Sequence, residues 1–595
     1  MPSTVKLAEY LFTRLHQLGV RSIHGVPGDY NLTLLDHIEP SGLHWVGNCN
    51  ELNAGYAADG YARINGLGAL ITTFGVGELS AVNAIAGAYC ERSAVVHVVG
   101  TPERSVQDSR LKVHHTFADG NFDRFAQMHA QITVAQASLW DPLMAPEQID
   151  AVLRQCLLQS RPVYIQVPVD LVDAPVEADR LYSQCLSAAV TSMNSTITPA
   201  HDTVLSLVLK KIKTAKHPAI LVDGESRALG ITEDVQHIVR LTKWPTWVTV
   251  FGKGLVDETA PNVHGVYRGS YDPKAKAFVD SSDLVLCFGP HFSTTNTFDS
   301  TSIPPQAVTI SYTDNEVRIG AQIFRDVRAR AAVSGLREEL SALAPTLPAV
   351  PGPELPEKHP MVCHSLLPSK QKVTQDRLWR VLANSIRPGD IVLGETGTAG
   401  YGVQEMSLPQ DTRVFAPVTW LSIGYMLPAA QGAALAQRDL LLSAPSRSNG
   451  DTKPARPRTV LFIGDGSFQM TVQELSTIIR ERLDVVIFLL NNDGYTIERC
   501  IHGLRKSYND VAPWRYLQAP SFLGAEADDD DDDDVFTATV RDWGDLQRVL
   551  ASKEMTSGKG LRMVEIVLDR EDVLEGPLLD LLQEERKVAL GGASQ

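Results

Sequence analysis

The sequence predicts an α/β protein built from three doubly wound domains, each a parallel sheet wrapped in helices. Apolar runs such as residues 68–74 and 94–99 alternate with stretches of helical character such as 81–92, which is typical of strands buried on both faces by crossover helices. A chain of 595 residues, 44% of them hydrophobic, is too long for one core. Domain sizes of roughly 100–200 residues favour three or four units, and we expect three.

Taken in chain order, the expected boundaries follow from changes in composition. Residues 1–186 form the first α/β unit, and a Ser/Thr-rich link at 187–198 leads to a second α/β unit at 199–345. Prolines repeat through residues 345–356, which stiffens the chain, prevents regular strand pairing and marks a linker. The third unit covers residues 370–580.

Two segments of the third unit are predicted to be solvated insertions. Residues 444–457 are rich in Pro, Ser, Arg and Gly, and residues 528–534 are seven consecutive aspartates whose mutual repulsion disfavours packing. The role of the acidic run stays open, since seven identical carboxylates lack the Gly turn and mixed oxygen ligands of a Ca²⁺ loop.

Charge and cysteine content restrict the function classes. With 54 basic and 70 acidic residues the formal charge is −16, which argues against nucleic acid or an anionic membrane as a partner and favours a small metabolite. Seven scattered cysteines without CxxC spacing are typical of reduced thiols, so we expect a cytoplasmic protein. The N-terminal residues lack the apolar core of a signal peptide, and no apolar run is long enough to span a bilayer.

The most informative motif is a strand that ends in Gly464-Asp465-Gly466. These glycines allow a ligand to approach the backbone closely, and the following helix begins with free amides, so a diphosphate fits here. Because lysine is missing from the motif, a divalent cation has to neutralise the phosphate charge. Asp465, Asn492 at the end of the next strand and the carbonyl of Gly494 offer the hard oxygen ligands that Mg²⁺ prefers.

These residues resemble those of a known family. Residues 464–467 (GDGS) with 490–498 (LNNDGYTIE) are similar to the thiamine-diphosphate motif, and residues 47–53 (GNCNELN), 56–63 (YAADGYAR) and 114–115 (HH) resemble the pyruvate decarboxylase branch of fungi. The similarity covers nearly the whole chain. It implies the thiamine-diphosphate-binding fold, thiamine diphosphate and Mg²⁺ as cofactors, and non-oxidative decarboxylation of a 2-oxo acid, with pyruvate going to acetaldehyde and CO₂.

The resemblance also assigns roles to residues. It implies that Glu51 hydrogen-bonds the aminopyrimidine ring and that Asp29, His114, His115 and Glu498 manage the substrate carboxylate and the protons. It implies that Thr398, Gly466 and Ser467 contact the diphosphate, while Ile423 bends the cofactor and Ile497 lines its reactive face. In this family the first and third units of different subunits share each site, so we expect a homodimer or homotetramer.

Some residues depart from the family pattern and leave the substrate open. Thr295 and Gly400 replace bulkier pocket residues, which favours a phenylpyruvate or indolepyruvate decarboxylase as the alternative function. Leu421 stands where some relatives have Gly. Three competing hypotheses are a flavin-containing carboligase, a Rossmann oxidoreductase based on the weak glycine pattern at 75–80, and an inactive structural paralogue.

Overall fold

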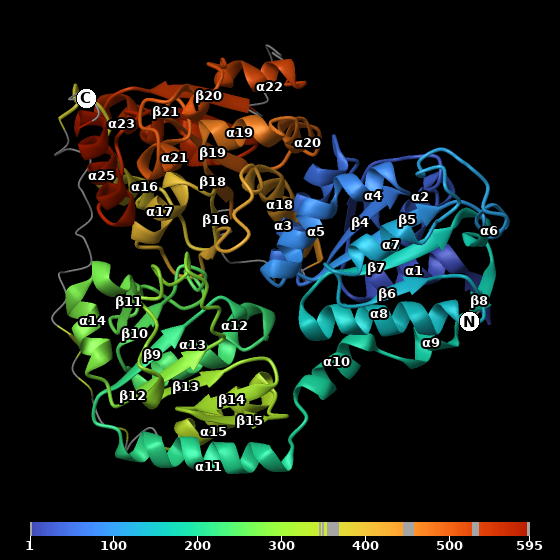
Figure 1. Cartoon of the computed structure of the whole chain (residues 1–595), viewed down its shortest axis with the longest axis horizontal. Coiled ribbons are helices and arrows are strands. Elements are labelled where there is room, and N and C mark those ends of the chain that lie inside the picture. Colours follow the sequence, from blue (N-terminus) through green and yellow to red (C-terminus); the bar gives the residue numbers. More distant parts are fainter. Residues whose placement is uncertain are drawn as a thin grey trace, which may run out of the picture. The chain divides into compact units, whose positions relative to one another are not determined.

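The protein is described by a computed structural model that covers residues 3–343, 347, 350, 352–353, 368–443, 457–525 and 535–591. Three sheets flanked by helices confirm the predicted α/β class (Figure 1). The predicted linker at 345–356 and the insertions at 444–457 and 528–534 lie largely outside the described residues. The chain forms two compact units: residues 1–193 with 425–454 and 471–483, and residues 194–424 with 455–470 and 484–595. The three predicted domain boundaries therefore stay a prediction.

The first sheet lies in the first compact unit and is wholly parallel, with strand order β3-β2-β4-β5-β7-β6. Its strands are β2 Ser22–Gly25, β3 His44–Trp45, β4 Gly68–Thr73, β5 Val95–Thr101, β6 Gln136–Ser138 and β7 Val163–Pro168, and a small ribbon pairs β1 Thr4–Lys6 with β8 Pro175–Glu177. The helices of this part are α1 Leu7–Gln17, α2 Leu32–Leu35, α3 Glu51–Asn65, α4 Val76–Ser80, α5 Val82–Cys90, α6 Arg104–Asp108, α7 Arg124–His129, α8 Ala145–Gln159, α9 Asp179–Ser183 and α10 Leu186–Asn194.

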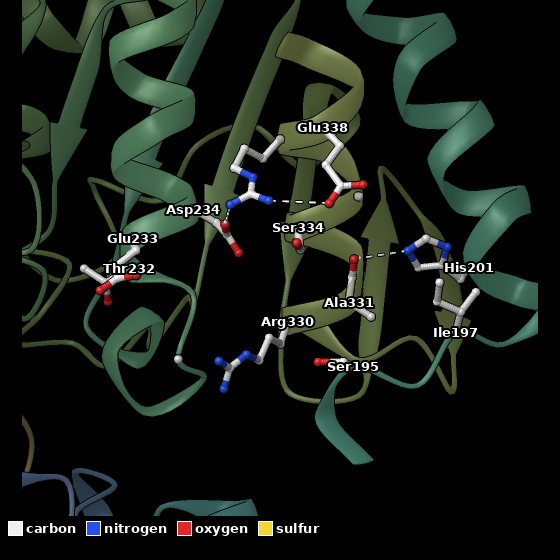
Figure 2. A pocket seen from close by; sticks show the side chains of 13 residues that line it. Ser195, Ile197, His201, Thr232, Glu233, Asp234, Arg330, Ala331, Ser334 and Glu338 are labelled. Carbon is white, nitrogen blue, oxygen red and sulfur yellow. Dashed lines mark hydrogen bonds and ion pairs between the residues drawn. The ribbon is translucent and has the colours of Figure 1, made fainter. Parts of the chain in front are cut away.

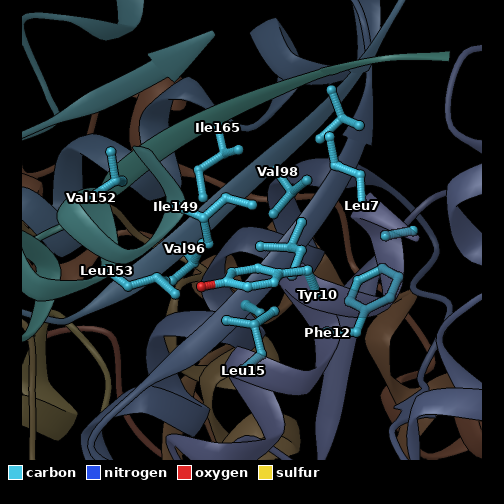
Figure 3. Close-up of a cluster of buried hydrophobic side chains, with 14 of the residues drawn as sticks. Leu7, Tyr10, Phe12, Leu15, Val96, Val98, Ile149, Val152, Leu153 and Ile165 are labelled. Atoms are coloured by element: carbon cyan, nitrogen blue, oxygen red, sulfur yellow. The ribbon is translucent and has the colours of Figure 1, made fainter. Parts of the chain in front are cut away.

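The core on one face of this sheet follows from helix periodicity. Leu7, Tyr10 and Leu15 recur along one side of α1 and are fully buried. They cluster with Val96 of β5 and Ile149 of α8 (Figure 3). One correction concerns the predicted link at 187–198. Its first half is helix α10, because Leu186 and Val190, four residues apart, are both buried on one helical face.

Two helices from the region predicted as the third domain belong to the first compact unit: α18 Met426–Ser443 and α20 Glu474–Arg480. Helices α3 and α18 approach each other through glycines. A Cβ atom on Gly60 would lie 2.2 Å from the carbonyl oxygen of Ala429, and one on Gly432 would lie 1.9 Å from that of Ala57. Main-chain atoms meet at these positions, so only glycine fits there.

The second sheet has the order β11-β10-β9-β12-β13-β14-β15. The sequence predicted a parallel sheet, but this one also has an antiparallel edge formed by β14 and β15. Such an edge is a common addition to doubly wound sheets. Its strands are β9 Pro218–Val222, β10 Thr246–Val248, β11 Val263–Val266, β12 Leu284–Phe288, β13 Thr309–Tyr312, β14 Glu316–Ile319 and β15 Gln322–Arg325. Its helices are α11 Pro199–Thr214, α12 Glu225–Ala228, α13 Thr232–Thr242, α14 Pro273–Asp280 and α15 Ala329–Leu343.

The third sheet is wholly parallel, with strand order β17-β16-β18-β19-β21-β20. Its strands are β16 Ile391–Gly394, β17 Arg413–Phe415, β18 Thr459–Gly464, β19 Val485–Asn491, β20 Val535–Val540 and β21 Leu561–Val567. The remaining helices are α16 Gln375–Ala383, α17 Thr398–Glu405, α19 Asp465–Thr471, α21 Thr496–Ile501, α22 Ala519–Phe522, α23 Trp543–Ala551, α24 Lys553–Ser557 and α25 Pro577–Gly591. When each sheet's strands are numbered from one in chain order, the first and third sheets share the order 2-1-3-4-6-5.

In each sheet the strand order reverses beside the first strand of that sheet, and in doubly wound folds ligands bind in the crevice beyond the strand ends at such a point. The reversal lies between β2 and β4 in the first sheet, β9 and β12 in the second, and β16 and β18 in the third. We refer to these positions as switch points. Among the described residues, no helix is both long enough and apolar enough to cross a membrane.

Candidate active site

A cavity of about 310 Å³ opens at the switch point of the third sheet. Its walls come from the segments that follow β16, β18 and β19, together with residues from the 417–423 segment and from the second sheet's loops. Nine of the thirteen predicted site residues line it: Thr398, Ile423, Asp465, Gly466, Ser467, Asn492, Gly494, Ile497 and Glu498. The sequence motif and the cavity therefore coincide.

Three of these residues bring polar groups together at one point. One end of the Asn492 side-chain amide lies 3.2 Å from Asp465 Oδ1 and 2.9 Å from the carbonyl oxygen of Gly494. With metal–oxygen distances of about 2.1 Å, neighbouring ligands of an octahedral Mg²⁺ ion lie about 3 Å apart, so this spacing fits the ion. Without a cation, hydrogen bonding favours the orientation in which the Asn492 NH2 group donates to both oxygens and its own oxygen accepts from Thr496 Oγ1 at 2.9 Å. Turned end for end, the amide would present its oxygen to a bound cation instead.

Burial makes the Asp465 carboxylate suited to a cation. The side chain begins α19 and is 1% exposed. Burial raises the pKa of Asp465 to about 6, although the main-chain N–H groups of Gly466 and Gly494 donate to its two oxygens at 2.8 and 3.0 Å. A divalent ion would compensate the buried charge that these amides only partly stabilise.

The neighbouring main chain leaves room for a phosphorylated group. A Cβ atom on Gly464 would meet nothing within 4 Å, whereas one on Gly466 would lie 2.5 Å from the Tyr495 ring. The hydroxyl-bearing residues Thr398 and Ser467 line the same cavity near the starts of α17 and α19. Hydroxyl groups and the free amides at helix starts are donors that bind phosphate oxygens.

The predicted pyrimidine contact, Glu51, lies in the first compact unit. It is the first residue of α3, whose N-cap Asn50 accepts a hydrogen bond from the amide of Asn53 at 2.8 Å. Burial raises the pKa of Glu51. A Cβ atom on Gly77 would lie 3.1 Å from Glu51 Oε1, so glycine at this position keeps the carboxyl group accessible.

The predicted proton-handling residues of the first unit form one cluster near its switch point. Asp29 follows β2, and its Oδ2 is hydrogen-bonded to Nε2 of His114, while its Oδ1 lies 3.7 Å from Nδ1 of His115. The His114 ring stacks on Tyr30 with centroids 5.0 Å apart, and His115 has a φ of 62°. The structure thus brings Asp29, His114 and His115 together, whereas Glu498 lines the cavity of the other unit.

Sequence reasoning missed part of the cavity wall. Val250 and Phe298 come from loops of the second sheet, and no local motif distinguishes them from core residues. Thr295 and Gly400, noted from the sequence as smaller pocket residues, do line the cavity. Leu421 also lines it and has a φ of 54°, a left-handed conformation that is uncommon for a bulky side chain.

A larger hollow of about 640 Å³ lies beside α11, α13 and α15 of the second sheet (Figure 2). None of the predicted site residues lines it. Arg337 on its wall pairs with Asp234 at 2.8 Å and with Glu338 at 3.4 Å, so charges in this hollow largely compensate one another. Size alone therefore does not mark the site.

Comparison with known proteins identifies the class. Three family profiles match the chain: "Thiamine pyrophosphate enzyme, N-terminal TPP binding domain" at residues 5–128, the central domain at 205–343 and the "C-terminal TPP binding domain" at 395–524. These matches, together with the fold and the polar cluster around Asp465, define the protein as a thiamine pyrophosphate enzyme. Its cofactor is thiamine diphosphate, with Mg²⁺ the usual partner metal of the family.

Curated relatives narrow the assignment. The chain is 53% identical over 586 residues to a pyruvate decarboxylase of Aspergillus parasiticus, covering 97% of both chains. It is 40% identical over 570 residues to one of Aspergillus fumigatus, covering 96% of this chain and 95% of the relative. It is 36% identical over 595 residues to pyruvate decarboxylase isozyme 1 of Saccharomyces cerevisiae, covering 100% of both. The chain belongs to the family of fungal-type pyruvate decarboxylases, which are carboxy-lyases.

Proposed function

We propose that this chain converts pyruvate and a proton into acetaldehyde and CO₂. The observation that carries the proposal is the convergence of the Asp465 carboxylate, the Asn492 amide and the Gly494 carbonyl in a cavity that belongs to a thiamine pyrophosphate fold. The relatives named pyruvate decarboxylase support pyruvate as the substrate. Phenylpyruvate or indolepyruvate, the alternative suggested by Thr295 and Gly400, is not favoured by these relatives.

In the proposed mechanism, residues of the third sheet hold the cofactor. Asp465, Asn492 and Gly494 bind Mg²⁺ through their oxygens, and Thr398, Gly466 and Ser467 donate to the diphosphate. Ile423 and Ile497 supply the apolar surface that orients the rings and excludes water. When bound, the cofactor supplies an electron sink for the carbon that loses CO₂.

Protons are handled by carboxyl and imidazole groups. We propose that Glu51 exchanges a proton with the pyrimidine ring, and its burial, which raises the pKa of Glu51, favours the protonated form of the carboxyl group. Asp29, His114 and His115 hold each other by hydrogen bonding and charge, so that one of them can deliver a proton to the product carbon. Glu498 lines the cavity and is proposed to orient the substrate carboxylate.

The first experiment measures CO₂ and acetaldehyde released from pyruvate by purified protein, with and without thiamine diphosphate and Mg²⁺. Release that depends on both additions supports the proposal. Phenylpyruvate serves as the comparison substrate, because removing one or two methyl-sized groups from a pocket changes discrimination by about 1–3 kcal/mol each. A kcat/KM that is higher for phenylpyruvate than for pyruvate would refute the choice of substrate.

We also propose a homodimer or homotetramer whose active sites combine residues of different subunits, as the family resemblance implies. Mixing an inactive Glu51→Gln protein with an inactive Asp465→Ala protein tests this arrangement. If Glu51 and Asp465 of one site come from different chains, random pairing restores one intact site in half of the dimers, about a quarter of parental activity. No recovery after confirmed subunit exchange would contradict shared sites.

The remaining proposals concern location and organisation. The described cysteines are all free thiols, which supports a cytoplasmic location. The formal charge of −16 supports a small molecule as the partner and argues against nucleic acid. The domain boundaries 1–186, 199–345 and 370–580 enclose the three sheets in order. Limited proteolysis with mass spectrometry tests these boundaries, since cleavage is expected in the intervening segments.

A further inference from the structure

The switch point of the second sheet holds a buried carboxylate of the chain itself. Asp223 follows β9 and is fully buried. It accepts hydrogen bonds from the Thr249 hydroxyl at 2.5 Å, the Gly224 amide at 2.6 Å, the His291 amide at 2.7 Å and the Asn296 side chain at 3.0 Å. Two of these donors belong to the segment 289–297 that follows β12. Asp223 therefore fixes the conformation of that segment at the place where related folds bind a ligand.

From this segment, side chains reach the segment 417–424 beside the cofactor cavity. Thr295 donates from its hydroxyl to the carbonyl oxygen of Val418, and Thr419 donates to Ser293 Oγ at 2.9 Å. His291 Nε2 lies 2.8 Å from Thr419 Oγ1. Both segments belong to the second compact unit.

Hydrogen-bond chemistry fixes the direction of these contacts. A carbonyl oxygen can only accept, so the Thr295 proton goes to Val418, and Thr295 accepts from Ser293, whose hydroxyl lies 3.3 Å away. Ser293 in turn accepts from Thr419, whose Oγ1 lies 2.8 Å from His291 Nε2. We call Thr419, Ser293 and Thr295 the hydroxyl chain. Hydrogen bonds that run in one direction polarise and strengthen one another.

The histidine at the start of the hydroxyl chain is also held on its other side. His291 Nδ1 lies 3.2 Å from Glu225 Oε1, at the beginning of α12. The ring is thus held between the Glu225 carboxyl group at one nitrogen and the Thr419 hydroxyl at the other.

The segment that receives these contacts contains one strained residue. Leu421 has a φ of 54°, and Val418, Leu421 and Ile423 line the cavity. A bulky residue in the left-handed region persists only where the surroundings over-determine its conformation. Contacts on Val418 and Thr419, three and two residues before Leu421, provide such a constraint.

We propose that Asp223 and His291 are positioning residues, which act through the hydroxyl chain to fix the wall of the cofactor cavity that carries Leu421 and Ile423. The second sheet thus contributes to the site by holding its geometry. The inference rests on the proposed function only in the role given to Ile423, because the contacts themselves belong to the protein without cofactor.

The test uses Thr419, which is absent from the cavity wall. Thr419→Val keeps the shape of the side chain and removes the hydroxyl, Thr419→Ser restores the hydroxyl, and Thr294→Val is the matched control on an exposed neighbouring threonine. Amide hydrogen exchange of peptides covering 416–424 is measured in the cofactor-free protein. We expect about five-fold faster exchange in Thr419→Val, and parental rates in Thr419→Ser and Thr294→Val.

Kinetics provide the second measurement. A small displacement of the cavity wall that carries Leu421 and Ile423 affects the geometry of the reaction more than the binding of the cofactor. The kcat of Thr419→Val should therefore fall about ten-fold, whereas the Kd for thiamine diphosphate should change less than about three-fold. Thr419→Ser should recover kcat to within about two-fold.

Unchanged exchange in 416–424 for Thr419→Val overturns the proposal, and so does equal loss of kcat in Thr419→Val and Thr419→Ser. If Thr419→Val does not fold, Ser293→Ala interrupts the same chain and is read by the same two measurements. A parental protein without decarboxylase activity would refute the proposed function, and the exchange measurement would still decide the positioning role.

Discussion

Glu78 provides the sharpest stability prediction, because it is a fully buried carboxyl group whose protonation changes near neutral pH. Burial raises its pKa to about 7, although the Tyr164 hydroxyl donates to Oε2 at 2.6 Å and the Gly75 amide donates to Oε1 at 2.8 Å. Two histidines face the same pocket. His129 Nε2 lies 3.6 Å from Glu78 Oε2, and the His97 ring is 5.0 Å from that of His129.

In the folded protein, His129, His97 and Tyr164 do not change charge between pH 5 and 8. Burial lowers the pKa of His129 to about 4 and that of His97 well below its usual range, and it raises the pKa of Tyr164 well above its usual range. Among these four side chains, Glu78 is therefore the one that changes charge between pH 5 and 8 in the folded protein. Glu78→Gln keeps the shape and an amide oxygen that can accept from Gly75, and it abolishes the titration.

The size of the effect follows from linkage. A folded-state pKa of about 7 against an ordinary 4.5 means that the folded protein binds this proton more tightly than the unfolded chain. The stabilisation is complete below about pH 4.5 and is lost as the pH rises through about 7. At about 1.36 kcal/mol per pKa unit, the loss reaches at most about 3 kcal/mol by pH 8. About 0.8 kcal/mol of this loss already precedes pH 5, so Glu78→Gln should gain about 2.5 kcal/mol of stability relative to the parent between pH 5 and pH 8.

Urea unfolding at pH 5 and pH 8, read by hydrogen exchange of peptides from β4, β5 and β7, measures this difference within the first compact unit. Glu177→Gln, which makes the same charge change at an exposed glutamate, is the control and should not alter the pH dependence. If Glu78→Gln and the parent lose stability equally between pH 5 and 8, the reasoning is wrong.

Three further perturbations test other parts of the structure. Arg14→Met removes the partner of Asp150, whose Oδ1 lies 2.8 Å from Arg14 Nε, with both side chains 1% exposed. The unpaired buried carboxylate should lower the free energy of unfolding, measured in urea, by about 3–5 kcal/mol. A decrease under about 1 kcal/mol would contradict this. Gly432→Ala forces a methyl group against the Ala57 carbonyl and should cost about 1–3 kcal/mol; an unchanged urea midpoint would show that α3 and α18 separate freely. Asp465→Ala should weaken thiamine diphosphate binding about 100-fold when it is measured by titration calorimetry in the presence of Mg²⁺. When a chelator removes the Mg²⁺, the variant and the parent should bind the cofactor equally weakly. Full affinity of the variant in the presence of Mg²⁺ would exclude Asp465 as a ligand.

The candidate cation site could be predicted from the sequence because its members lie at strand ends. Asp465 and Asn492 each follow an apolar run, and parallel strands bring their carboxyl ends to one edge, so local patterns sufficed. The antiparallel edge β14–β15 and helix α10 were not predicted. Both are short elements whose pattern is weak: α10 buries only Leu186 and Val190.

The contacts around Thr419 could not be predicted. Thr419 meets Ser293 and His291 across more than 120 residues, and threonine, serine and histidine in loops carry no periodic pattern. Only the three-dimensional arrangement of the second sheet brings them together. For the same reason, the family motifs indicated Glu51 and Asp465, while Asp223 and Glu78 became evident only through their burial and hydrogen bonds.

The shared strand order of the first and third sheets places a crevice at the same strand ends in both. In the third sheet the loops at these ends carry the candidate cation ligands, and in the first sheet they carry Asp29 with its imidazole neighbours. A change of chemistry at either crevice then requires substitution of a few loop residues on a scaffold that remains unchanged.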